Sequence, residues 1–133
     1  MGDDAMNRRA ALGLMAATGA GAALAGLPAG AGAAEVAAHR LARLFRDGEA
    51  ARAIGRAYLS RAPEEADAGT LFARLAADDP QAAHALSSTD TEGARAWLRG
   101  RVRADFAAGR TADVAGWRLA RTEARAMALL ALA

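Results

Sequence analysis

Few side chains in this sequence have both the type and the spacing that catalysis or metal binding requires. His39 and His84 lie in different predicted helices, so a metal site would need both of them to converge with distant carboxylates. No serine or threonine has a nucleophile-elbow context, and the glycines after the N-terminal segment do not follow a strand at phosphate-binding spacing. The chain has no cysteine, which excludes disulfides and thiolate metal sites. The sequence therefore predicts a protein that is not an enzyme, with no cofactor-binding or metal-ligating residues.

The most suggestive spacing is a set of arginines at every fourth residue, Arg95, Arg99 and Arg103. They form a basic stripe on a predicted helix, beside an apolar side made of residues 97, 98, 102 and 106. Such a stripe can meet an acidic partner or anionic headgroups. The alternative is a solvated edge whose aliphatic stems cover the core.

Trp117 stands beside a glycine in a stretch where the apolar period changes. Tryptophan is favoured at the energetic centres of interfaces, so Trp117 can be an exposed anchor for a partner. It can equally cover the core between the last two helices. We take Arg95, Arg99, Arg103 and Trp117 as the candidate partner surface.

The neighbouring sequence indicates a role for each of three carboxylates. Asp105 lies four residues after Arg101 in the same predicted helix, close to its apolar side, and is expected to pair with it. Glu64 and Glu65 directly follow Pro63. At that position they are expected to favour a helix N-terminus rather than to act as a catalytic carboxylate pair.

Apolar residues spaced by three and four predict the helices that position these side chains, over 35–46, 49–60, 67–78, 80–86, 90–108 and 122–132. The expected N-terminal caps are Asp47, Asp79 before Pro80, Thr89 with Glu92, and Thr122 with Glu123. Residues 111–120 alternate weakly around Gly116, which predicts a small β-hairpin, with a structureless loop as the alternative. The expected fold is all-α, a compact bundle of four to six short helices with this hairpin before the last one.

Residues 1–33 are predicted to be an export signal and residues 34–133 a single helical domain. An arginine pair is followed by an uncharged Gly/Ala-rich run and by an Ala-x-Ala site ending at Ala33. We expect cleavage after Ala33 or Ala34. A retained membrane anchor is the alternative, and the weak hydrophobicity of the run argues against it.

Arg8, Arg9 and Leu12 resemble the twin-arginine (Tat) pattern Ser/Thr-Arg-Arg-x-Phe-Leu-Lys, while positions 7, 11 and 13 depart from it. Sec export remains the alternative route. The resemblance implies contact with the Tat export machinery and a signal peptidase, and a periplasmic or secreted location. Membrane contact is then expected only through an uncleaved signal.

Residues 105–125 carry Asp-Phe-x-x-Gly-Arg-Thr and Gly-Trp-x-Leu-x-x-Thr-Glu-Ala-Arg. With the signal, they resemble small bacterial Tat-signal proteins of no established activity. The overall arrangement is more distantly similar to the small Tat-signal subunit of membrane-bound flavin dehydrogenases of the gluconate 2-dehydrogenase type. In that family the signal-bearing subunit travels with a cofactor-bearing partner.

Two functions follow as expectations. The first is an exported, non-enzymatic accessory or interaction protein, such as a small subunit that assists export, maturation or anchoring of a larger redox enzyme. The alternative is a free-standing small-ligand or metal-binding protein of the cell envelope. A formal net charge of +2 gives no indication of a nucleic-acid partner.

Overall fold

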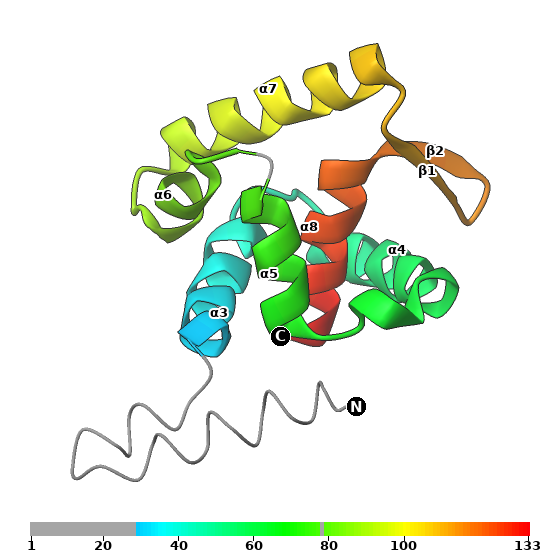
Figure 1. Ribbon diagram of the computed structural model, residues 1–133, viewed down its shortest axis with the longest axis horizontal. Coiled ribbons are helices and arrows are strands. Elements are labelled where there is room, and N and C mark those ends of the chain that lie inside the picture. The colour runs from blue at the N-terminus through cyan, green and yellow to red at the C-terminus, as the bar shows by residue number, and fades with distance from the viewer. Residues whose placement is uncertain (1–28, 78) are drawn as a thin grey trace, which may run out of the picture.

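The computed structural model of the protein describes residues 29–77 and 79–133 (Figure 1). The predicted signal residues Arg8, Arg9 and Leu12 lie outside the described residues. The described chain is all-α apart from one hairpin, which confirms the predicted fold class. Its elements are α3 (Ala29–Ala42), α4 (Gly48–Arg61), the 3-10 turn η1 (Pro63–Glu65), α5 (Ala68–Ala77), α6 (Ala82–Ser87), α7 (Thr91–Ala108), β1 (Thr111–Val114), β2 (Trp117–Ala120) and α8 (Arg121–Leu132).

Helix α8 is the centre of the fold and packs against α3, α4, α5 and α7 (Figure 1). Every residue from Ala126 to Leu130 is buried. A helix that is apolar on nearly all sides is stable only when other elements enclose it. The last helix of the sequence is therefore the one around which the rest of the bundle is assembled.

Helix α4 approaches α8 at Gly55, where the two backbones nearly touch. A Cβ atom at Gly55 would overlap the carbonyl oxygen of Met127 and would lie 2.8 Å from the amide nitrogen of Ala128. Glycine is the residue that permits such an approach, because it has no side chain to separate the helices. The sequence reading assigned no role to Gly55.

Helix α3, the first element of the described residues, begins at Ala29, earlier than the predicted start and inside the segment predicted as the signal. It ends at Ala42 rather than at residue 46, and it places Ala34, Ala37 and Leu41 in the core. Within residues 29–77 and 79–133, none of the helices has the length and hydropathy that a membrane span requires.

Two predicted helix boundaries are confirmed. Asp47 caps α4, accepting a hydrogen bond from the amide of Ala50 at 3.0 Å. Gly109 ends α7 in the left-handed region, with φ 74°.

Two other predicted caps are wrong. The residue that caps α7 is Asp90 rather than Thr89, and it accepts from the amide of Gly93 at 3.0 Å. Helix α6 begins at Ala82, two residues after the predicted start. The carboxylate of Asp79 closes a turn instead, accepting from the amide of Gln81 at 2.9 Å and from Nε1 of Trp97 at 2.7 Å.

The predicted hairpin is confirmed. β1 and β2 pair antiparallel, with Val114 opposite Trp117 at the turn end. The connecting residues Ala115 and Gly116 both have positive φ, 51° and 84°, as a two-residue turn of type I′ requires. Residues opposite one another share a face, so Val114, Trp117 and Leu119 lie on one side of the hairpin. Val114 and Leu119 are buried, and this side therefore faces the body of the protein.

Candidate functional site

A buried carboxylate joins the end of α7 to both ends of the hairpin. Asp105 is 1% exposed. Its Oδ1 atom accepts from Nε of Arg110 at 2.9 Å, and its Oδ2 atom accepts from the backbone amide of Thr122 at 2.7 Å. Nη2 of Arg101 lies 3.7 Å from Oδ1, which confirms the predicted pair with Arg101. Asp105 thus binds both Arg110, the residue before β1, and Thr122, which follows β2, and so holds the two ends of the hairpin together.

Asp105 also replaces a local cap at the start of α8. The first amides of a helix have no partner within the helix and need an acceptor from elsewhere. The predicted cap, Thr122, is wrong, because it lies inside the helix as its second residue. The residue before the helix, Ala120, has no side chain able to cap. The carboxylate seventeen residues upstream supplies the acceptor. A negative charge at a helix N-terminus is additionally favoured by the helix dipole.

A second buried carboxylate, Glu65, joins η1 to α4, α5 and α8. Arg125 binds it with two hydrogen bonds, Nε to Oε1 and Nη2 to Oε2, both at 3.0 Å. The hydroxyl of Tyr58 donates to Oε1 at 2.9 Å, and Nη1 of Arg74 lies 3.4 Å from Oε2. Glu64 and Glu65 do lie in the first turn of η1, as expected after Pro63, but the carboxylate of Glu65 is in addition bound by these distant side chains.

The pKa values of these carboxyl groups are set by a balance between burial and hydrogen bonding. Burial alone would raise the pKa of Asp105, but hydrogen bonds from Thr122 and Arg110 outweigh it and lower the pKa below its ordinary value. Burial also opposes ionisation of Glu65, whose pKa is lowered by hydrogen bonds from Arg125 and Tyr58. Both groups are consequently ionised at neutral pH, which makes them poor general acids or bases. Their arrangement is suited to holding elements together.

We expect the stability of the protein to fall in acid for this reason. Because the folded pKa values of Asp105 and Glu65 lie below the unfolded ones, their stabilisation is fully present above the unfolded values and is lost as pH falls through the folded values. Glu123, whose pKa is raised by burial, acts in the opposite direction. Thermal unfolding should show a constant Tm from neutrality to about pH 5 and a falling Tm below about pH 4. A Tm that stays level down to about pH 2 would contradict the ionised state of both carboxylates.

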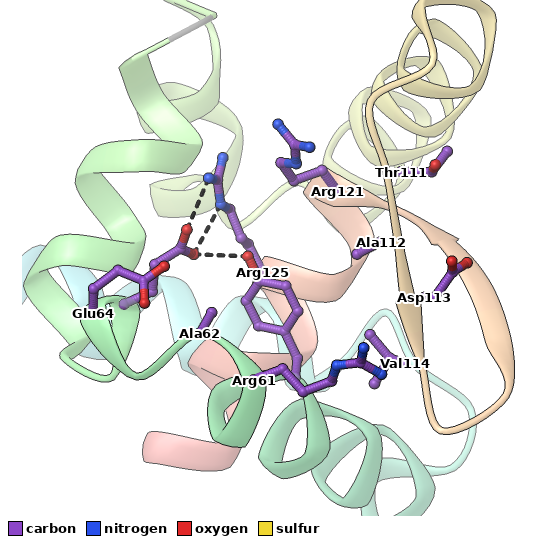
Figure 2. A pocket seen from close by; sticks show the side chains of 11 residues that line it. Arg61, Ala62, Glu64, Thr111, Ala112, Asp113, Val114, Arg121 and Arg125 are labelled. Atoms are coloured by element: carbon purple, nitrogen blue, oxygen red, sulfur yellow. Dashed lines mark hydrogen bonds and ion pairs between the residues drawn. The ribbon is translucent and has the colours of Figure 1, made fainter.

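A cleft of about 430 Å³ opens beside the Glu65–Arg125 pair, between the end of α4, the hairpin and the start of α8 (Figure 2). Its lining includes three arginines, Arg61, Arg121 and Arg125, and three acids, Glu64, Glu65 and Asp113. The volume is within the range of small-ligand sites. The even balance of charge makes the cleft polar without favouring one sign, so the chemistry it can perform is hydrogen bonding to a polar group or segment.

Only part of the predicted arginine stripe is free of contacts with the rest of the described chain. Arg95 donates to Glu92 at 3.0 Å and to the backbone carbonyl of Arg43 at 3.3 Å, so it ties α7 to the loop after α3. Arg99 and Arg103 are exposed.

Arg95 lies near the start of α7, whereas Trp117 follows its end (Figure 1). Ala108 is thirteen positions after Arg95 in the helix, a span of roughly 20 Å at a rise of about 1.5 Å per residue. The structure therefore does not bring the whole stripe to the tryptophan.

Trp117 is 65% exposed, so it does not cover the core between the last two helices. It lies on the inward side of the hairpin at the turn end, directly opposite the buried Val114. Val114 and Leu119 are thus buried on this side of the hairpin, whereas the indole of Trp117 is not covered. Of the candidate surface residues, Trp117 is the one whose exposure is unusual for its type.

The described residues contain no group of three or more histidine, aspartate or glutamate side chains placed to hold a metal ion. Comparison with protein-family models, with curated proteins and with solved structures finds no match for this chain. Its function must therefore be inferred from its own geometry.

Proposed function

We propose that this chain is an exported, non-enzymatic accessory protein that binds a larger exported protein through the turn end of its hairpin. The observation that carries the proposal is the 65% exposure of Trp117 on a side of the hairpin where Val114 and Leu119 are buried and Ala112 is half-buried. A large aromatic side chain that is exposed on a fixed element can fill a pocket in a partner and contribute much of the binding energy.

The rigidity of the hairpin supports this proposal. Its two ends are joined by the Asp105 hydrogen bonds and by the amide of Arg121, which donates to the carbonyl of Arg110 at 3.0 Å. Binding through a segment that is already ordered avoids much of the entropy cost of fixing a mobile loop. The backbone that carries Trp117 is thus already held in place before the partner arrives.

The cleft beside the hairpin supports the proposal as well. Asp113 and Val114 belong both to β1 and to the cleft lining, so a partner that covers Trp117 has the cleft beside it (Figure 2). The cleft offers charged donors and acceptors, among them Arg61 and Asp113. The partner surface that would fit has an apolar pocket for the indole and, next to it, a polar segment for the cleft. The proposed Tat route adds a reason, since a chain that folds before export can carry a folded partner with it.

Replacing Trp117 with alanine is expected to abolish partner binding while leaving the fold intact. An exposed side chain contributes little to the folded state, so Tm should change by no more than about 3 °C. Loss of a central interface tryptophan typically costs about 2 kcal/mol or more of binding free energy. The test is capture of tagged wild-type and W117A proteins with their partners from the native cell envelope, quantified by mass spectrometry. Arg99→Ala, an exposed change on α7 away from the hairpin, is the control that should retain the partner. Equal capture by W117A and wild type would contradict the proposed surface.

A further inference from the structure

We propose that a small inorganic anion, of the size of chloride, binds in a second and smaller cavity beneath the hairpin. This cavity has a volume of about 30 Å³ and is enclosed by residues of α5, α7 and α8 and by the residue before β1. Five arginines and one acid dominate its lining: Arg74, Arg101, Arg110, Arg121, Arg125 and Asp105.

The charge around this cavity is strongly unbalanced. Asp105 pairs with Arg101 and Arg110, and the neighbouring Glu65 pairs with Arg74 and Arg125. Among the described residues, no carboxylate lies within ion-pairing distance of the fifth arginine, Arg121. Five guanidinium groups and two carboxylates therefore leave an excess of three positive charges around a small, partly enclosed space. Guanidinium groups do not relieve this excess by losing protons, because their pKa lies far above neutral pH.

Arg101, one of the residues that line the cavity, has an unused hydrogen-bond donor. Nε of Arg101 is buried and has no hydrogen-bond partner among the described residues. The Arg101 side chain as a whole is 17% exposed. A buried N–H without an acceptor costs free energy, and the cost is larger for a charged group. An anion in the cavity would offset the positive charge of the arginines around it, whereas a water molecule would not.

The size of the cavity selects the kind of anion. A water molecule needs roughly 10–15 Å³ of such volume, so the space holds one or two waters or one monatomic anion. It is too small for an organic phosphate. Arg74 and Arg110, whose side chains are 46% and 40% exposed, lie where the cavity meets solvent and leave a route for exchange. The bound anion would connect α5, α7 and α8, and the hairpin would be held more firmly when it is present.

The proposal is tested by thermal unfolding of the full chain in sodium chloride mixed with sodium gluconate at fixed ionic strength, so that general screening stays constant. An anion that binds only the folded state raises Tm, and the increase is expected to grow with chloride concentration according to its affinity. Arg121→Gln, which removes the arginine without a carboxylate partner, should weaken the chloride response about tenfold or more. Arg99→Gln, an exposed change outside the cavity lining, should leave it unchanged.

Chlorine NMR line width provides a second measurement that does not depend on stability. The wild-type protein should broaden the chloride resonance, and R121Q should broaden it much less. Absence of both the chloride-dependent rise in Tm and the broadening would overturn the proposal. So would equal responses of wild type and R121Q, or stabilisation by sulfate with none by chloride at the same ionic strength.

Discussion

Replacing Asp105 with alanine is expected to lower the free energy of unfolding by about 3–5 kcal/mol, as is typical when one partner of a buried ion pair is removed. The change removes the acceptor of the Thr122 amide and leaves Arg110 and Arg101 without their shared carboxylate. A domain of this size has a total stability of about 5–15 kcal/mol. Tm should therefore fall by roughly 15 °C or more, measured by circular dichroism or calorimetry.

The matched control for this variant is Asp113→Ala on the neighbouring hairpin. Asp113 also pairs with an arginine, Arg118, at 3.2 Å, but both side chains are more than half exposed. Exposed ion pairs contribute about 0–1 kcal/mol, so D113A should unfold close to the wild type. Similar losses for D105A and D113A would show that burial of Asp105 is not the source of its effect.

Replacing Glu65 with alanine is expected to cost a similar amount, about 3 kcal/mol or more, for a related reason. The Arg125 side chain is 13% exposed and would keep its charge without the carboxylate that holds it. The hydroxyl of Tyr58 would lose its acceptor in the same step. Glu65→Gln keeps one oxygen acceptor, so its free energy of unfolding should lie between those of E65A and the wild type. Equilibrium unfolding in urea measures the difference directly.

Glu64→Ala is the control for Glu65, since the two residues are adjacent and Glu64 is exposed. It should leave stability nearly unchanged. E65A should also flatten the acid limb of the Tm–pH profile, because one of the two carboxyl groups with a lowered pKa is gone. If E65A unfolds like E64A, the Glu65–Arg125 pair is not a structural joint.

Much of the fold can be predicted from local sequence. Helix α4 has its cap at Asp47, α7 stops at Gly109, and the hairpin turns at Gly116 as expected. In each case the decisive group lies within a few residues of the element that it controls. The wrong cap at Thr89 arises because Thr89 and Asp90 can both cap and only the folded chain decides between them.

The two buried carboxylate sites could not be predicted in the same way. Glu65 and Arg125 are sixty residues apart, and nothing near either one indicates the other. The Asp105–Arg101 pair follows from helical spacing, but the contact from Asp105 to the amide of Thr122 depends on how the hairpin folds back. The sequence offers Thr122 as a local cap for the last helix, so it does not indicate that the acceptor for that helix lies seventeen residues upstream.

Affinity purification of the C-terminally tagged protein from its own cell envelope tests the proposed function most directly. Mass spectrometry would identify co-purifying proteins and the N-terminal residue of the tagged chain. We expect a larger exported protein in stoichiometric amount, lost from the W117A preparation, and an N-terminus at Ala34 or Glu35. A tagged chain that is recovered alone from the envelope would contradict the accessory function and favour a free-standing ligand-binding protein.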